Sequence, residues 1–271
     1  MIEAAPAKIN LALHLRRRRD DGYHDLETLF AFTDFGDTLE VMPQDRVTLA
    51  VTGPFAASAG SGTDNLVISA AHALAAVAGV DGGAALVLDK QIPVAAGLGG
   101  GSADAAATLR LLNRFWGLYW PLDRLAAVAA PLGADVPVCV FSATMAGAGR
   151  GDALKPVDLD VAETPCLLVN PRVAVPTGPV FAGWDGVDRG PLDPLAWRHA
   201  RNDLTAPAVV IAPVIADVLA SLAASRATFV RMSGSGATCL ALYANRTECA
   251  AAATAIGNAR PGWWMTATSL R

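Results

Sequence analysis

The sequence predicts an α+β fold of two lobes, and three observations support this class. Short alternating strands dominate the first fifty residues, helices and strands then interleave without a strict strand–helix–strand repeat, and a proline-rich stretch begins near Lys155. A doubly wound parallel sheet would instead alternate strands and helices throughout. The chain has 271 residues, of which 53% are hydrophobic and 17% are charged, which is enough for two modest hydrophobic cores.

The first fifty residues are expected to form a meandering sheet. Between Ile9 and Leu15 every second residue is apolar, which is the period of a strand that buries one face. A turn is expected from Asp20 to Gly22. Short β-rich pieces follow it, separated by Asp and Gly residues, at residues 26–32, 37–42 and 46–52.

The next part of the chain alternates helices with a strand. Thr63 to Asn65 is a capping sequence before apolar residues at helical spacing, and Gly79 is positioned to end that helix. A strand is predicted at residues 84–89, a helix at 103–116 with its amino terminus at a glycine run, and a shorter helix at 123–132.

Prolines become frequent from about Lys155. This change of composition predicts a domain boundary between residues 1–155 and residues 156–271. Beyond the boundary, strands are predicted at residues 167–170, 228–232, 238–243 and 263–268. Helices are predicted at residues 207–224 and 247–256.

Composition and charge argue against several classes of protein. A net charge of −4 disfavours nucleic-acid binding, which needs clustered Lys and Arg. The four cysteines show no CxxC spacing, so we expect buried reduced thiols rather than a zinc or redox site. The amino terminus lacks the pattern of a signal peptide, and no stretch reaches about 18 uninterrupted apolar residues. We therefore expect a cytoplasmic protein without a membrane partner, either a monomer or a homodimer.

The glycine run Gly97-Leu98-Gly99-Gly100-Gly101-Ser102 lies between a predicted strand and a predicted helix. Glycines let the backbone approach a ligand closely, and the first N–H groups of a helix have no intrahelical acceptor. The helix dipole adds about half a positive charge at the same place. This arrangement predicts a phosphate site, although a purely structural loop stays open as the alternative.

Two better-known phosphate motifs do not fit the run. The dinucleotide fingerprint G-x-G-x-x-G/A fails because its last position holds Ser102, which disfavours a dinucleotide oxidoreductase. The Walker motif G-x-x-x-x-G-K-[ST] fails because no lysine of the chain follows a glycine. A different kind of phosphate loop is needed.

The segment from Pro93 to Ala103 resembles the motif P-x-x-x-G-L-G-S/G-S/G-S-A of the galactokinase, homoserine kinase, mevalonate kinase and phosphomevalonate kinase superfamily. This resemblance implies a two-lobed small-molecule kinase fold with an ATP-binding cleft between the lobes. It also implies ATP and Mg²⁺ as cofactors, with a nucleotide-binding domain at residues 1–155 and a substrate-side domain at 156–271.

Further segments resemble one branch of the superfamily, the kinases that act on CDP-methylerythritol in the non-mevalonate isoprenoid route. They run in the same order over residues 5 to 238 and comprise Ala5–Leu11, Asp21–His24, Leu132–Pro137, Val175–Thr177 and Met232–Ala237. The resemblance implies phosphorylation of the 2-hydroxyl of that substrate by ATP. A homoserine or mevalonate kinase, and a nucleotide-binding relative without catalysis, remain the alternatives.

Carried over position by position, the resemblance implies that Asp135 is the base and that Lys8 polarises the acceptor hydroxyl. The implied ATP residues are Asn65, Lys90, Pro93, Gly97, Leu98, Gly99, Gly100, Gly101, Ser102 and Ala103. The expected substrate residues are Asn10, Tyr23, His24, Thr177, Phe181, Ser233, Gly234 and Ser235. No metal ligand is assigned, and Ser102 is the one candidate for magnesium.

Simpler interpretations stay open at several of these positions. Lys8 could be a strand-end lysine, Asp135 a turn residue and Phe181 a core residue, while Tyr23 with His24 could cap a hairpin and Ser233 to Gly236 could be a tight turn. The run Arg16 to Arg19 fits a solvated hairpin tip, with attraction of an anionic substrate as the alternative.

Overall fold

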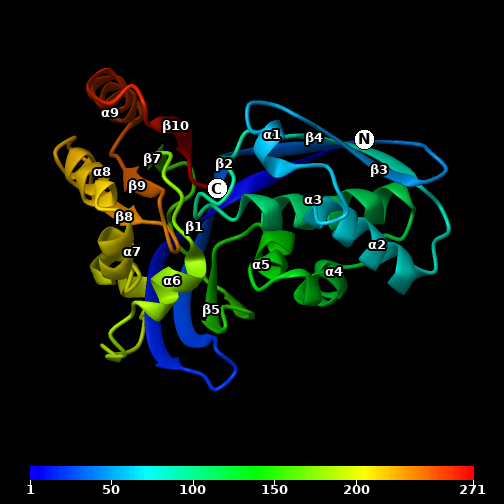
Figure 1. Cartoon of the computed structure of the whole chain (residues 1–271), viewed down its shortest axis with the longest axis horizontal. Helices are drawn as coiled ribbons and strands as arrows, with labels where there is room; N and C mark the ends of the chain where they lie inside the picture. The colour runs from blue at the N-terminus through cyan, green and yellow to red at the C-terminus, as the bar shows by residue number, and fades with distance from the viewer. The chain divides into compact units, whose positions relative to one another are not determined.

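The computed structural model describes residues 1–271, and its backbone divides into two compact units that interleave along the chain. Unit 1 consists of Met1–Lys8, Gly36–Val94 and Gly99–Ser142; unit 2 consists of Ile9–Phe35, Ala95–Leu98 and Ala143–Arg271. The mixture of strands and helices confirms the α+β prediction (Figure 1). The change of composition near Lys155 falls inside unit 2, and the division at that residue stays a prediction.

Two long strands, β1 (Ile2–Arg18) and β2 (His24–Met42), contribute residues to both units. In unit 1, β2 pairs antiparallel with β4 (Ala84–Asp89), and β3 (Val47–Thr52) pairs parallel with β4. In unit 2, β2 pairs antiparallel with β5 (Met145–Gly149), which pairs with β6 (Ala153–Pro156). The strand predicted from Ile9 to Leu15 lies within β1, but the expectation of one buried face is wrong, because every residue of this segment is buried.

The prediction of separate short pieces at residues 26–32 and 37–42 is wrong, because β2 runs through both. Gly36 is needed for close approach, since a Cβ there would lie 2.3 Å from the carbonyl oxygen of Ala5. Asp37 is buried and binds the ammonium of Lys90. Gly and Asp often mark turns, but in this strand Gly36 allows close packing and Asp37 forms an ion pair.

The helices of unit 1 pack on one another and carry the glycine run. They are α1 (Ala56–Ala59), α2 (Leu66–Ala78), α3 (Gly100–Phe115), α4 (Leu122–Ala129), the 3₁₀ turn η1 (Ala130–Leu132) and α5 (Val136–Phe141). Helices α2 and α3 lie side by side (Figure 1). As predicted, Asn65 caps α2 and Gly79 ends it in the left-handed conformation.

Unit 2 contains a four-stranded antiparallel sheet in the order β10-β7-β9-β8. The strands are β7 (Pro165–Asn170), β8 (Phe229–Met232), β9 (Cys239–Leu242) and β10 (Trp264–Ser269), which confirms the four strands predicted here. Helices α8 (Val214–Ala223) and α9 (Arg246–Ala259) pack against it (Figure 1). The core between them contains Leu167, Val169, Ala241, Ile215 and Ile256.

The single helix predicted at residues 207–224 is wrong. The structure has two helices here, α7 (Thr205–Ile211) and α8, because Pro213 between them lacks the N–H that a continuous helix would use. The four cysteines are free and buried, as expected. No helix has both the length and the apolar character that a membrane span requires.

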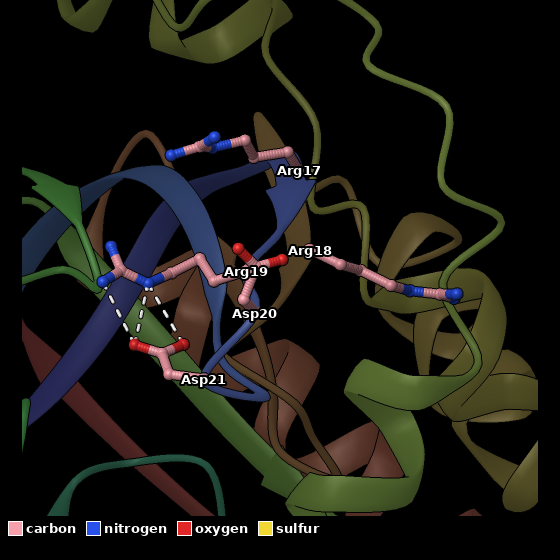
Figure 2. Close-up of a pocket in the computed structure, with 5 residues that line it drawn as sticks. All are labelled: Arg17, Arg18, Arg19, Asp20 and Asp21. Atoms are coloured by element: carbon pink, nitrogen blue, oxygen red, sulfur yellow. Dashed lines mark hydrogen bonds and ion pairs between the residues drawn. The ribbon is translucent and has the colours of Figure 1, made fainter.

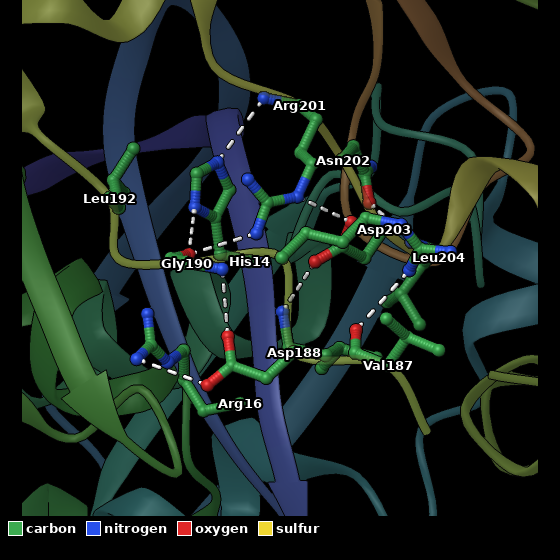
Figure 3. A network of polar contacts seen from close by, with 12 residues as sticks. His14, Arg16, Val187, Asp188, Gly190, Leu192, Arg201, Asn202, Asp203 and Leu204 are labelled. Carbon is green, nitrogen blue, oxygen red and sulfur yellow. Dashed lines mark hydrogen bonds and ion pairs between the residues drawn. The ribbon is translucent and has the colours of Figure 1, made fainter. Parts of the chain in front are cut away.

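A polar network in unit 2 holds the segment that follows α6 (Thr177–Ala182) and contains the 3₁₀ turn η2 (Pro194–His199) against β1 (Figure 3). His14 Nδ1 lies 3.2 Å from the carbonyl oxygen of Gly190, and the backbone N–H of Arg201 donates to His14 Nε2 at 3.3 Å. The Arg201 side chain also donates to Gly190 and to Asp203. Burial lowers the pKa of His14 below its ordinary value, in keeping with a neutral ring between one donor and one acceptor.

Candidate active site

The glycine run turns sharply into α3, and two of its glycines have left-handed backbone angles. Gly99 is the N-cap of α3 with φ +63°, and a Cβ there would lie 3.0 Å from Lys8 Cε in unit 1. Gly97 has φ +77°, and a Cβ there would lie 2.7 Å from the carbonyl oxygens of Ser233 and Gly236 in unit 2. Both positions therefore require glycine for conformation and for space.

Lys8 and Asp135 meet in unit 1, as the resemblance implies. Lys8 Nζ lies 2.9 Å from Asp135 Oδ2, with the lysine side chain 5% exposed and the aspartate side chain 39% exposed. Asp135 is the N-cap of α5, and Pro137 in the first turn favours the start of that helix at this point. The pair thus presents a buried ammonium and an accessible carboxylate next to Gly99.

Lys90 occupies a buried ionic cluster of unit 1. Its Nζ lies 2.5 Å from Asp37 Oδ2 and 2.6 Å from Asp104 Oδ2, and all three residues are at most 3% exposed. Burial, opposed by the Lys90 charge and reinforced by Asp37, raises the pKa of Asp104 well above its ordinary value. The ammonium is paired with two buried carboxylates, and the implied contact of Lys90 with ATP stays a prediction.

Asn65 already has structural partners in unit 1. Its Oδ1 accepts the N–H of Val67 at 2.9 Å, and its Nδ2 donates to the carbonyl oxygen of Gly60 at 2.9 Å. The amide therefore caps α2 and ties the preceding turn to it. The implied contact with ATP stays a prediction.

The turn between β8 and β9 is held tightly in unit 2. Ser233 Oγ donates to the carbonyl oxygen of Gly97 at 2.9 Å and accepts the backbone N–H of Asn10 at 3.2 Å. Asn202 Nδ2 donates to the carbonyl oxygens of Met232 and Gly234, each at 2.8 Å. The structure thus joins the first part of the glycine run to the turn that contains the expected substrate residues Ser233, Gly234 and Ser235.

Further hydroxyl and amide groups follow the same turn. Thr177 Oγ1 lies 3.1 Å from Ser235 Oγ, and Asn10 Nδ2 donates to Thr28 Oγ1 at 2.7 Å. Thr177 is exposed at the start of α6, whereas Asn10 is buried. The predicted substrate residues Asn10, Thr177, Ser233 and Ser235 are therefore connected through one polar turn.

His24 and Phe181 come together in an aromatic cluster of unit 2, with Trp184 as the third member. The ring centroids of His24 and Phe181 are 5.3 Å apart, and those of His24 and Trp184 are 5.7 Å apart. His24 Nε2 is buried without a hydrogen-bond partner, as is the indole N–H of Trp184. Burial lowers the pKa of His24 and the charge of Arg18 lowers it further, so the ring is neutral near pH 7.

Tyr23, next to His24 in the chain, is 56% exposed at the hairpin tip. The Arg150 guanidinium lies 5.4 Å from the centre of its ring. The implied contact of Tyr23 with the substrate stays a prediction.

The arginine run at the hairpin tip borders a pocket of about 290 Å³ lined by Arg17, Arg18, Arg19, Asp20 and Asp21. Figure 2 shows the three arginines pointing in different directions, with the Arg19 side chain donating a hydrogen bond to the Asp21 carboxylate. Arg17 pairs with Asp25, and Arg18 donates to the carbonyl oxygens of Ala182 and Trp184. These partners favour the hairpin-tip interpretation, and Arg18 also ties the tip to the end of α6.

The side chains that could hold a metal are few. The described residues contain no group of three or more His, Cys, Asp or Glu side chains arranged around a metal position. Ser102, half-buried in the first turn of α3, offers one hydroxyl. This donor set fits Mg²⁺ only as it is usually bound beside a nucleotide, with phosphate oxygens and waters as its other ligands.

Comparison with known proteins places these features in a family. The pattern of the GHMP kinases N terminal domain matches residues 65–143, and that of the GHMP kinases C terminal matches residues 188–261. A 4-diphosphocytidyl-2-C-methyl-D-erythritol kinase of Rhizorhabdus wittichii is 55% identical over 99% of this chain and 94% of its own length. The corresponding protein of Sphingopyxis alaskensis is 50% identical over 100% and 99%.

The chain belongs to the 4-diphosphocytidyl-2-C-methyl-D-erythritol kinase family. A crystal structure of a 4-(cytidine 5'-diphospho)-2C-methyl-D-erythritol kinase agrees, with a TM-score of 0.85, 35% identity and coverage of 100% and 99%. A homoserine kinase of Cytophaga hutchinsonii, at 17% identity and a TM-score of 0.77 over 99% of this chain and 94% of its own, shares the fold. This GHMP kinase is an ATP-dependent small-molecule kinase of isoprenoid biosynthesis.

Four residues that contact the predicted site residues were missed from the sequence: Asp37, Asp104, Trp184 and Asn202. One signal was available for Asp104, because it is a carboxylate within an alanine-rich helical stretch. Another was available for Trp184, which lies three residues after Phe181 and so shares a face with it in helical geometry. Asp37 and Asn202 gave no local signal, since their partners are distant in the chain.

Proposed function

We propose that this kinase transfers the γ-phosphate of ATP to the 2-hydroxyl of 4-diphosphocytidyl-2-C-methyl-D-erythritol, with Asp135 as the base. The names of its relatives support the substrate. The observation that carries the catalytic assignment is the 2.9 Å contact between Lys8 and Asp135, next to Gly99 in the glycine run.

In the proposed reaction, the acceptor oxygen forms a bond to the γ-phosphorus while the bond from that phosphorus to the bridging oxygen of ADP breaks. The hydroxyl proton passes to the Asp135 carboxylate, whose exposed position allows a ligand to reach it. Lys8 orients Asp135 and stabilises the negative charge that develops on the acceptor oxygen. Proteins catalyse phosphoryl transfer mainly by aligning the reacting groups and by stabilising the negative charge that develops.

The N–H groups at the start of α3 would hold the ATP phosphates, which suits their position after Gly99. Bound with ATP, Mg²⁺ would neutralise phosphate charge, and Ser102 is the residue that we propose nearest to it. In unit 2, the neutral His24 ring with Phe181 and Tyr23 would hold the cytosine, which presents a flat face and a polar edge. Thr177 and the turn from Ser233 to Ser235 would hold the adjoining phosphates.

In the direct test, wild-type protein is assayed with ATP and Mg²⁺ and with one of three acceptors: CDP-methylerythritol, homoserine or mevalonate. We expect ADP release and a phosphorylated product with the first acceptor alone. Asp135→Asn should retain binding of both substrates and lose about 10²- to 10⁴-fold in kcat, the range for a lost general base. Transfer to homoserine or mevalonate but not to CDP-methylerythritol would refute the substrate, and wild-type turnover by Asp135→Asn would refute the base.

A further inference from the structure

The ionic cluster of Asp37, Lys90 and Asp104 connects three segments of unit 1 at the start of α3. Asp37 belongs to β2, Lys90 follows β4 directly, and Asp104 lies on the second turn of α3. Their exposed fractions are 1%, 2% and 3%, so solvent does not screen their interactions. Apart from the ATP contact that the resemblance implies for Lys90, none of the three has a role in the chemistry described above.

Asp37 does more than neutralise Lys90. Its Oδ2 accepts from the ammonium at 2.5 Å, while its Oδ1 accepts the backbone N–H groups of Gln91 at 2.5 Å and Ile92 at 2.7 Å. One carboxylate therefore accepts three donors, two of them from the backbone that leads into the glycine run. Its position determines where that segment starts.

Asp104 differs from Asp37 in its surroundings. Only Oδ2 has a partner, the Lys90 ammonium at 2.6 Å, and Oδ1 is buried without a hydrogen bond. The raised pKa of Asp104 agrees with this contrast. With one proton on Asp104, the cluster is electrically neutral, with a positive Lys90 and a negative Asp37.

The first residue of α3 rests on this cluster. A Cβ added to Gly100 would lie 3.0 Å from Lys90 Nζ and 3.1 Å from Ile92 Cγ2. The ammonium and the loop that Asp37 holds therefore limit how closely the backbone of α3 approaches. A shift of Lys90 would move the helix start that carries the free N–H groups.

We propose that Asp37 is a positioning residue for ATP, which holds Lys90 and the Gln91–Ile92 backbone so that the first turn of α3 faces the phosphates. Lys90 acts through Gly100 and does not itself touch the nucleotide. This inference rests on the proposed ATP site at the glycine run.

The same substitution at the two carboxyl groups should give unequal results. In Asp37→Asn, one amide cannot accept from Lys90 and from both backbone N–H groups, because its NH₂ group would face a donor. In Asp104→Asn, the amide resembles a protonated carboxyl: its oxygen accepts from Lys90, and its NH₂ takes the place of the acid group. Asp81→Asn, at an exposed position of the same unit, controls for the change of formal charge.

The measurement is steady-state kinetics at varied ATP with saturating acceptor, together with thermal shifts on adding MgATP. We expect Asp37→Asn to raise the KM for ATP at least tenfold with a smaller change in kcat, because a shift of about 1 Å in a positioning element is costly. Asp104→Asn should change that KM by no more than about threefold, by the isosteric argument. Equal effects of the two substitutions, or a wild-type KM in Asp37→Asn, would overturn the assignment.

A second variant keeps the test decisive if Asp37→Asn does not fold. Gly100→Ala improves intrinsic helix propensity by about 1 kcal/mol, yet its methyl group presses on Lys90 and Ile92. We expect wild-type far-UV circular dichroism and at least a fivefold weaker affinity for MgATP. Wild-type affinity in this variant would overturn the positioning role.

The design separates this inference from the proposed function. If wild-type protein is stabilised by MgATP while Asp37→Asn and Gly100→Ala respond equally well, the positioning role fails and the ATP site stands. If Gly99→Ala leaves MgATP binding unchanged, the glycine run is not the ATP site and the positioning role fails with it, whereas the acceptor and the role of Asp135 are tested separately by the acceptor panel and by Asp135→Asn.

Discussion

The residues proposed to act on the phosphates and those proposed to bind the cytosine differ in how they use charge. In unit 1, Lys8 with Asp135 and Lys90 with Asp37 and Asp104 form ion pairs of 2.5 to 2.9 Å around the start of α3. In unit 2, the cluster of His24, Phe181 and Trp184 consists of rings with 5.3 to 5.7 Å between centroids, and its one titratable ring is neutral near pH 7.

This difference matches the two tasks. The phosphoryl group that passes from ATP to a hydroxyl carries negative charge, which must be stabilised at a defined point, and paired side chains keep positive charge at such a point. A cytosine is neutral and flat, so faces and single donors or acceptors recognise it without fixed charge. The comparison predicts that changes in unit 1 affect turnover and ATP, whereas changes in the aromatic cluster affect the KM of the acceptor.

The largest expected effect is that of Lys8→Met. Removing the ammonium leaves Asp135 without its 2.9 Å partner and the developing alkoxide without a positive charge. We expect kcat to fall by about 10²- to 10³-fold while the KM for ATP stays within about threefold. Lys155→Met, at an exposed lysine, is the control and should behave as wild type. A change confined to KM would contradict the assigned role.

His24→Ala tests the other side of the comparison. Loss of the ring removes a contact of Phe181 and Trp184 and the buried Nε2 that has no protein partner. The KM for CDP-methylerythritol should rise about tenfold, the effect of one lost hydrogen bond of about 1.4 kcal/mol, with kcat and the KM for ATP little changed. His72→Ala on the exposed face of α2 is the matched control. A tenfold fall in kcat would contradict the prediction that the aromatic cluster affects only the KM for the acceptor.

Gly99→Ala and Gly79→Ala sharpen the comparison within unit 1. Both glycines are left-handed, at φ +63° and +65°, so alanine at either should cost about 1 to 2 kcal/mol of stability. Only at Gly99 would the methyl group also meet Lys8, at 3.0 Å, whereas nothing lies within 4 Å at Gly79. We therefore expect similar melting temperatures and a roughly fivefold loss of kcat/KM for Gly99→Ala alone. Equal activities would show that the contact with Lys8 is unimportant.

The smallest expected effect concerns pH. His24 has a pKa below its ordinary value, first through burial and then through Arg18, so the KM for CDP-methylerythritol should be flat from pH 8 to about 6.5 and rise below that. Arg18→Gln removes a positive neighbour, which raises the pKa of His24 and starts the rise in KM at a higher pH. Arg17→Gln, whose partner is Asp25, is the control.

The same shift has a consequence for stability, with a defined sign. The pKa of His24 in the folded protein lies below that in the unfolded chain, so the unfolded chain takes up the proton first as the pH falls. Stability from the neutral ring is thus complete above about pH 6.5 and declines below it. Melting curves of wild type and His24→Ala should converge as the pH is lowered to 5; parallel curves would contradict the shift.

Much of the fold could be predicted because its signals are local. The helix that Asn65 caps, the strand at residues 84–89 and the helix at the glycine run each depend on neighbours within a few residues, and all three are present. Two of the errors arose where one residue type has several uses. Gly36 and Asp37 resemble a turn sequence, but they lie within a strand, where Gly36 allows close packing and Asp37 forms an ion pair. Pro213 separates two helices in a stretch whose apolar spacing is that of one continuous helix.

By itself the sequence determined the elements, the phosphate-type glycine run and, through family resemblance, the residues Lys8 and Asp135. Only the tertiary structure decided which groups surround them. The pairing of Lys90 with Asp37, 53 residues away, and the contact of Gly97 with Ser233, 136 residues away, bring together segments that no local pattern connects. Burial then determines protonation at Asp104 and His24, because desolvation disfavours the charged form and depends on the packing of the whole unit.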